Sequence, residues 1–178
     1  MKATIIGTGS YIPEYILTNQ ELSTMVETDD EWIVTRTGIS ERRIQKSGDV
    51  ADMAVNAALK ALDNAGINSE DIDLIIAATS TPDYLFPNCS SIIQKNTGAI
   101  NAVCFDISAA CSGFIMALSA AKAYIEAGMY KKVLIVCSEK MSRITDWKDR
   151  STCILFGDGA GACVVESSEQ EGVKSVDL

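Results

Sequence analysis

The sequence predicts an α/β sandwich built around a mainly parallel mixed sheet. Apolar runs of strand length recur along the chain, and several lack polar alternation, which is typical of strands covered on both faces. Segments with helical spacing of apolar residues separate these runs. Strands and helices therefore alternate, as they do in α/β folds.

The first third of the chain predicts one strand and three helices. We expect the strand over residues 2–6, ended by a turn at Gly7-Thr8-Gly9, and short helices over 18–26 and from Asp29 or Asp30 to Gly38. A longer amphipathic helix is expected over residues 50–65, because its apolar residues repeat at helical spacing and Gly66 follows as a natural stop.

The remainder predicts further strands alternating with two helices. The expected strands cover residues 73–79, 102–107, 132–138 and 161–166, with 173–176 beginning a sixth. The expected helices cover residues 88–97 and 111–127, and each is followed by a glycine.

Composition narrows the function classes. The chain has 178 residues, enough for one globular domain with a sizeable core, and a net charge of -9, which disfavours binding to nucleic acid. No apolar stretch is long enough for a membrane helix, and the apolar start is too short for a signal peptide. We therefore expect a cytoplasmic protein.

The six cysteines are not arranged as a metal site. None pair as C-x-x-C and the chain has no histidine, so we expect no bound metal. Cysteines within apolar segments such as AVCF, LIVC and GACVV fit small buried thiols.

Cys111 differs in position from the other cysteines. In FDISAACSGF it lies between an apolar strand and a long helix, and small residues around it permit a tight turn. Unpaired N–H groups at a helix N-terminus favour a thiolate and could stabilise an oxyanion on a thioester carbonyl. The alternative is an inert cysteine packed under the helix.

Four motifs in order resemble those of β-ketoacyl-acyl-carrier-protein synthase III enzymes. They are IIGTGSYIPE, DDEWIVTRTGISERRI, DISAACSGF and ILFGDGAGA, and the match runs from Met1 to about Glu166. The resemblance implies a thiolase-like layered sandwich, with residues 1–178 as its N-terminal half and the C-terminal half absent from this chain. It also implies that Cys111 accepts an acyl group and that condensation with malonyl-acyl-carrier protein follows.

The resemblance also implies two groups of binding residues. Trp32, Arg36 and Arg150 would bind coenzyme A, although Arg36 also belongs to a basic cluster with Arg42, Arg43 and Lys46 that alone fits a solvated surface. The acyl pocket would be lined by Phe86, Met141 and Phe156, whose alternative role is core packing. In the family the Phe86 position reaches across a homodimer interface.

One part of the family's chemistry cannot come from these residues. The family's decarboxylative step uses a His and an Asn from the C-terminal half, and this chain has no histidine. We therefore expect the isolated chain to be inactive in condensation, to expose an apolar face, and to self-associate or bind a complementary half.

Several alternatives stay open. GDGAGA at residues 157–162 does not have the spacing or context of a dinucleotide loop, so acyl-CoA is expected as a substrate and no cofactor is implied. Another thiolase-fold CoA-dependent synthase, such as a polyketide starter synthase or a hydroxymethylglutaryl-CoA synthase-like enzyme, fits less well. A non-catalytic half that only binds CoA or dimerises is the second alternative.

Overall fold

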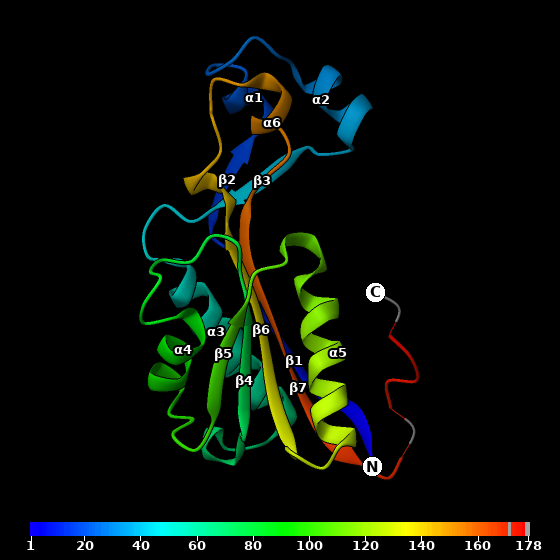
Figure 1. The fold of residues 1–178 in the computed structure, drawn as a ribbon. Coiled ribbons are helices and arrows are strands. Elements are labelled where there is room, and N and C mark those ends of the chain that lie inside the picture. Colours follow the sequence, from blue (N-terminus) through cyan, green and yellow to red (C-terminus); the bar gives the residue numbers. More distant parts are fainter. Residues whose placement is uncertain (171, 177–178) are drawn as a thin grey trace.

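Two sheets organise the chain in the computed structural model, which describes residues 1–170 and 172–176. The larger sheet has the order β1-β7-β6-β4-β5, and the smaller one pairs β2 with β3 (Figure 1). The large sheet consists of β1 (Lys2–Tyr11), β4 (Leu74–Ala78), β5 (Val103–Ile107), β6 (Lys132–Lys140) and β7 (Asp158–Ser168). The small sheet consists of β2 (Tyr15–Thr18) and β3 (Glu41–Ile44).

Six α-helices and three 3₁₀ turns connect the strands within the described residues. The α-helices are α1 (Asn19–Leu22), α2 (Asp30–Thr37), α3 (Val50–Ala65), α4 (Cys89–Thr97), α5 (Gly113–Glu126) and α6 (Arg150–Cys153). The 3₁₀ turns are η1 (Ser69–Asp71), η2 (Ala110–Ser112) and η3 (Met141–Arg143).

The large sheet is mixed, as expected from the sequence. Strand β4 runs parallel to both β5 and β6, whereas β7 runs antiparallel to both β6 and β1. The parallel part is thus confined to β4, β5 and β6. Strand β7 runs antiparallel to them because it begins at the end of the sheet where β6 stops. Strand β4 is buried at every position, as its unbroken apolar sequence predicts.

Helices cover both faces of the large sheet. Helices α3 and α4 lie on one face and α5 on the other (Figure 1). Two core clusters follow this division, one containing Ala58 and Ile93 from α3 and α4, the other containing Ala117 and Ile125 from α5. The chain therefore forms a three-layer α/β sandwich.

The two glycines of the first motif allow α3 to lie directly on β1. A Cβ atom at Gly7 would lie 2.6 Å from the Ala61 carbonyl oxygen, and one at Gly9 would lie 2.3 Å from that of Ala57. The expectation that these glycines end the strand is wrong, since β1 continues to Tyr11. They are instead positions where a helix backbone approaches a strand closely.

A second, smaller core lies beside the β2–β3 sheet. It contains Leu17, Leu22, Ile33, Ile44, Cys153 and Ile154. The buried guanidinium of Arg42 holds this region together by donating to Asn19 Oδ1 at 2.9 Å and to the Ile154 carbonyl at 2.8 Å. Strands β2 and β3 and helix α6 were not predicted from the sequence.

Other predicted elements differ in extent. Helix α3 has the expected bounds and α2 ends before Gly38 as expected, but the helix expected over residues 18–26 covers only Asn19–Leu22. The helix expected from residue 111 begins at Gly113, after the η2 turn. Residues 173–176 do not form the expected sixth strand. Within the described residues, none of the helices has the length and apolar character that crossing a membrane requires.

Candidate active site

Most of the predicted site residues lie at one end of the strands of the large sheet. The register pairs Ala78 with both Ile107 and Cys137, and Lys140 with Asp158, so β4, β5 and β6 end at the edge where β7 begins. Cys111 follows β5, Phe86 follows β4, Met141 follows β6, and Phe156 precedes β7. Ligands of open α/β sheets bind at this kind of edge, outside the carboxyl ends of parallel strands.

Cys111 is presented by a tight turn between β5 and α5. It lies in the η2 turn, two residues before α5, and it is exposed. The preceding residue, Ala110, has a φ of 45°, in the left-handed region that non-glycine residues rarely adopt. The turn thus has the strained backbone of a nucleophile elbow without its G-x-S-x-G sequence.

The helix behind Cys111 packs closely on the sheet. A Cβ atom at Gly113 would lie 3.0 Å from Ala78 Cβ, so glycine lets the start of α5 approach the end of β4. The buried residues of α5 are Gly113, Ala117, Ala121 and Ile125. Phe114, near the start of α5, is 42% exposed. Together with Ile115 and Met116, it forms an exposed apolar surface on α5.

The other five cysteines fit the interpretation as inert thiols. Burial raises the pKa of Cys89 and Cys163 to about 12, and that of Cys104 and Cys137 to about 11. Burial also raises the pKa of Cys153. Among the six cysteines, all of which lie within the described residues, only Cys111 is exposed.

The three residues expected to bind coenzyme A lie together. The backbone N–H of Trp32 donates to the Asp29 carboxylate at 2.7 Å, and Asp29 thereby caps α2. The guanidinium carbon of Arg36, one turn later, lies 4.4 Å from the Trp32 ring centroid, and that of Arg150 from α6 lies 4.5 Å from it. Arg150 also donates to the Glu27 carbonyl at 3.1 Å. Segments far apart in sequence thus surround one indole with two cations.

The rest of the basic cluster does not gather at Trp32. Arg42 is buried in the smaller core, Arg43 donates to the Pro13 carbonyl at 3.2 Å, and the Lys46 ammonium lies 3.8 Å from the Tyr15 ring centroid. Only Arg36 of these four cations therefore has a geometry suited to a ligand on Trp32.

The three residues expected to line the acyl pocket lie on separate segments. Phe86 is 91% exposed in the loop between β4 and α4, beside the exposed Tyr84 and Leu85. Phe156 is 38% exposed, and Met141 is half-buried in η3. Their role as an acyl pocket stays a prediction.

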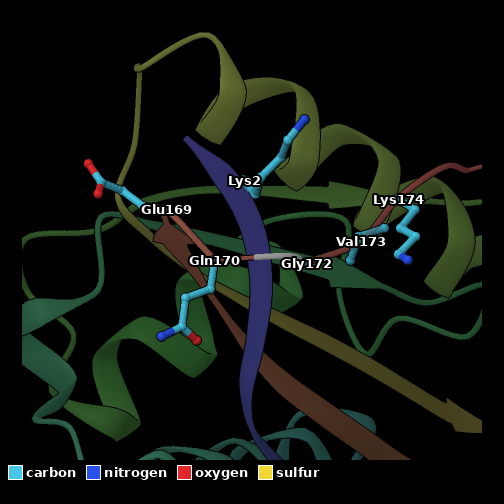
Figure 2. A pocket seen from close by; sticks show the side chains of 6 residues that line it. All are labelled: Lys2, Glu169, Gln170, Gly172, Val173 and Lys174. Atoms are coloured by element: carbon cyan, nitrogen blue, oxygen red, sulfur yellow. The ribbon is translucent and has the colours of Figure 1, made fainter.

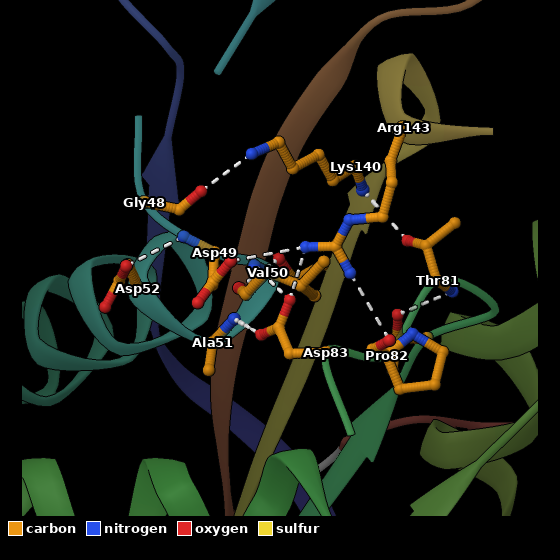
Figure 3. Close-up of polar contacts among 12 residues, drawn as sticks. Gly48, Asp49, Val50, Ala51, Asp52, Thr81, Pro82, Asp83, Lys140 and Arg143 are labelled. Atoms are coloured by element: carbon orange, nitrogen blue, oxygen red, sulfur yellow. Dashed lines mark hydrogen bonds and ion pairs between the residues drawn. The ribbon is translucent and has the colours of Figure 1, made fainter. Parts of the chain in front are cut away.

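A polar network that sequence reasoning missed anchors the base of the Phe86 loop. The Asp83 carboxylate accepts hydrogen bonds from the N–H groups of Val50 at 3.0 Å and Ala51 at 2.9 Å, and it pairs with Arg143 at 2.6 Å (Figure 3). Burial alone would raise the pKa of Asp83, but these hydrogen bonds and the Arg143 charge outweigh it and lower the pKa. The loop is thereby joined to α3 and η3.

A second missed carboxylate belongs to the glycine-rich motif. Asp158 is buried and accepts from the N–H groups of Gln45 and Ser142, each at 2.8 Å, and from the Ser142 hydroxyl at 2.6 Å. It therefore fixes η3, and with it Met141, to the start of β7 and the end of β3. The polar position within GDGAGA was the only local signal for this role.

A cavity at the opposite edge of the sheet lies away from these residues. It has a volume of about 320 Å³ and is lined by Lys2, Glu169, Gln170, Gly172, Val173 and Lys174 (Figure 2). Lys2 pairs with Ser168 at the end of β7, whereas the turn that contains Cys111 follows the other end of the sheet. The candidate site is therefore placed at the end of the sheet that carries Cys111, and this cavity is not part of it.

Comparison with known proteins gives consistent matches. The family described as 3-Oxoacyl-[acyl-carrier-protein (ACP)] synthase III matches residues 105–178. The Beta-ketoacyl-[acyl-carrier-protein] synthase III of Ehrlichia canis (strain Jake) is 53% identical over 180 residues, which cover 99% of this chain and 56% of that protein. The crystal structure of 3-oxoacyl-[acyl-carrier-protein] synthase III from Aquifex aeolicus VF5 superposes with a TM-score of 0.93 at 52% identity, covering 94% of this chain and 55% of that one.

The chain belongs to the β-ketoacyl-acyl-carrier-protein synthase III family. It spans about half the length of the curated relatives it matches, and it corresponds to their N-terminal part. The thiolase-like fold predicted from the motifs is confirmed by the superposition. As a β-ketoacyl-acyl-carrier-protein synthase III homologue, the chain is also similar to the priming β-ketosynthase of the R1128 polyketide pathway, with a TM-score of 0.93 and 42% identity over 96% of this chain and 52% of that one.

Proposed function

We propose that Cys111 is the nucleophile of a 3-oxoacyl-[acyl-carrier-protein] synthase III that initiates fatty acid synthesis with acyl-CoA, and that acetyl-CoA is the primer. The observation that supports this best is the exposed sulfur of Cys111 in a strained turn, at the carboxyl edge of the parallel strands. A nucleophile needs this accessibility, whereas the other five cysteines are buried or half-buried.

The first half-reaction is a thioester exchange. The Cys111 thiolate attacks the acyl carbonyl carbon, a new carbon–sulfur bond forms, and the bond to the CoA sulfur breaks. The CoA thiolate leaves and takes up a proton from solvent. N–H groups at the start of α5 are the donors nearest in sequence that could stabilise the oxyanion of the tetrahedral intermediate.

The second half-reaction needs groups from outside this chain. Malonyl-acyl-carrier protein would lose carbon dioxide, and its carbanion would attack the Cys111 thioester to release the product and restore the thiolate. The chain has no histidine, so the His and Asn that the family resemblance assigns to this step come from the C-terminal half. The isolated chain should therefore acylate without condensing.

Coenzyme A is proposed to bind over Trp32. The indole offers a π face to the adenine, while Arg36 and Arg150 supply charge for its phosphates. Both guanidiniums lie over the indole in the free protein, so an adenine that stacks there displaces at least part of one cation. Arg150 is held additionally by Glu27.

We further propose a cytoplasmic homodimer in which the complete family fold surrounds the site. The exposed side chains of Phe86 and Leu85 suit contact with a second copy, and Phe86 and Met141 with Phe156 would then border the acyl group. The exposed apolar surface of α5 suits contact with the C-terminal half.

Acylation of Cys111 tests this function. After incubation with acetyl-CoA, mass spectrometry of the intact protein should show one acetyl adduct, which Cys111→Ala abolishes and the control Cys104→Ala retains. No adduct on the wild-type protein would contradict the proposal and favour a half that only binds CoA or dimerises.

The similarity to a priming polyketide synthase favours one alternative. The acyl acceptor separates the two when this chain is assayed together with the C-terminal half, with malonyl-acyl-carrier protein and malonyl-CoA supplied in parallel. A strong preference for malonyl-acyl-carrier protein with an acetyl primer supports the fatty acid pathway. Turnover with malonyl-CoA instead would contradict it.

A further inference from the structure

The strained residue before Cys111 is held by a side chain from another part of the chain. Ala110 has a φ of 45°, a strained conformation for a non-glycine residue that persists only when its surroundings hold it. The Ala110 N–H donates to the Ser80 hydroxyl oxygen at 3.1 Å. Ser80 follows β4, so this contact spans 30 residues of sequence.

Ser80 is in turn fixed by one carboxylate. The Ser80 N–H donates to Glu139 Oε1 at 2.7 Å. The Thr81 hydroxyl donates to Glu139 Oε2 at 2.5 Å, and the Thr79 hydroxyl donates to the same oxygen at 3.4 Å. Glu139, on β6, therefore binds three consecutive residues of the segment that carries the Ser80 hydroxyl.

The segment 79–81 is also tied to the strands on either side. The Thr81 hydroxyl oxygen accepts from the Lys140 N–H at 2.9 Å, a contact shown in Figure 3. On the other side, the Thr79 N–H donates to the Ile107 carbonyl at 3.1 Å, at the end of β5. The segment thus bridges β6 and the strand that leads to Cys111, which gives the Ser80 hydroxyl a defined place.

We propose that Ser80 and Glu139 are positioning residues for Cys111. Glu139 holds Ser80, Ser80 holds Ala110 in its left-handed conformation, and Ala110 directs the Cys111 sulfur outward from the sheet edge. Neither residue needs to touch the substrate. This inference deepens the proposed function, because a nucleophile must be oriented before it can attack an acyl carbonyl.

Alkylation of Cys111 by iodoacetamide measures the presentation of the sulfur without any acyl substrate. With the modified peptide quantified by mass spectrometry, Ser80→Ala should slow alkylation about tenfold, because a misplacement of about 1 Å can cost up to about a hundredfold and the loss of one hydrogen bond should shift the turn by less. Ser80→Thr keeps the hydroxyl and should stay within about twofold of wild type. Ser23→Ala removes an exposed hydroxyl that donates to the Gln20 carbonyl, and it should leave the rate unchanged.

Either of two results would overturn the role of Ser80. One is a Ser80→Ala protein that melts as wild type does and is alkylated at the wild-type rate. The other is a Ser80→Thr protein as slow as Ser80→Ala, since the hydroxyl would then not be the group that matters.

The Ala110→Gly background tests whether Ser80 acts through the conformation of Ala110. Glycine adopts positive φ without steric cost, so in an Ala110→Gly background the loss of the Ser80 hydroxyl should slow alkylation less than it does in wild type. An equal slowing in both backgrounds would show that Ser80 does not act through the conformation of Ala110.

The role of Glu139 is tested by combination. Glu139→Ala should slow alkylation, and adding it to Ser80→Ala should slow it no further, because both act through the same contact. Fully additive slowing would contradict this path. Acetylation by acetyl-CoA is followed in parallel, so a wild-type protein that is alkylated but not acetylated contradicts the proposed function and still decides the positioning role.

Discussion

The guanidinium of Arg143 lies 2.6 Å from the carboxylate of Asp83, whose side chain is only 5% exposed (Figure 3). Arg143 is in η3, next to Met141, and Asp83 is at the base of the loop that carries Phe86. The same carboxylate accepts from two N–H groups at the start of α3. One buried acid therefore joins a helix N-terminus to two segments of the candidate site.

Asp83 should make stability depend on pH. Its pKa is lowered in the folded protein, so its contribution to the free energy of unfolding is fully present above the ordinary carboxyl pKa of about 4 and is lost as pH falls through the folded pKa. We expect Asp83→Asn to destabilise the protein by about 2 kcal/mol at pH 7, below the usual cost of breaking a fully buried pair because Arg143 is partly exposed.

Urea unfolding of wild type and Asp83→Asn between pH 3 and pH 7 measures this difference. The difference in free energy should shrink toward pH 3, because the Asp83 carboxyl of the unfolded chain takes up a proton near its ordinary pKa of about 4, above the pKa of the folded protein. Asp146→Asn, which removes an exposed carboxylate bonded only to a nearby backbone N–H, is the matched control. A difference that stays constant across this range would contradict the assignment.

Replacing Trp32 should weaken coenzyme A without altering the nucleophile. Trp32→Ala removes the ring over which Arg36 and Arg150 lie, and we expect the Kd for CoA to rise about tenfold, since stacking and cation–π contacts contribute roughly 1–2 kcal/mol. Isothermal titration measures the Kd, while the iodoacetamide rate at Cys111 should stay at its wild-type value. Trp32→Phe should bind more tightly than Trp32→Ala, because it keeps a π face.

Two glycines on neighbouring strands should respond differently to the same substitution. Gly9→Ala should destabilise the protein by about 3 kcal/mol, because the new Cβ atom would lie 2.3 Å from the Ala57 carbonyl and force α3 away from β1. Gly161, in β7, has no heavy atom within 4 Å of an added Cβ. Gly161→Ala should therefore change the unfolding free energy by less than about 1 kcal/mol. Similar losses in denaturant unfolding would refute the close-packing role of Gly9.

Elements with strong local signals could be predicted from sequence. Helix α3 has apolar spacing over its full length and Gly66 at its end, and its predicted bounds are those observed. Strands β2 and β3 are only four residues long, and β3 contains Arg42 and Arg43. The stability of β3 depends on the buried contacts of Arg42 with Asn19 and Ile154, which no local sequence pattern reveals.

The candidate site likewise contains residues that could be predicted from sequence and contacts that could not. The place of Cys111 between a strand and a helix follows from local sequence. Trp32 and Arg36 lie in a family motif, whereas Arg150 lies outside the four motifs and was implied by the wider resemblance. Glu139 and Ser80 are 59 residues apart and meet only because β6 and β4 are neighbours in the sheet. Such contacts depend on strand order, which alternation of helices and strands does not determine.

The antiparallel return of β7 leaves a long segment between two paired strand ends. Lys140 pairs directly with Asp158, so the whole intervening segment, including η3 and Arg150, is a single excursion that leaves and rejoins the sheet at one residue pair. Insertions or deletions within this excursion would reshape the surroundings of Trp32 while every strand kept its register. Changes at its exposed positions, such as Asp146 and Lys148, should cost folding little, whereas Cys153 and Ile154 are buried in the smaller core.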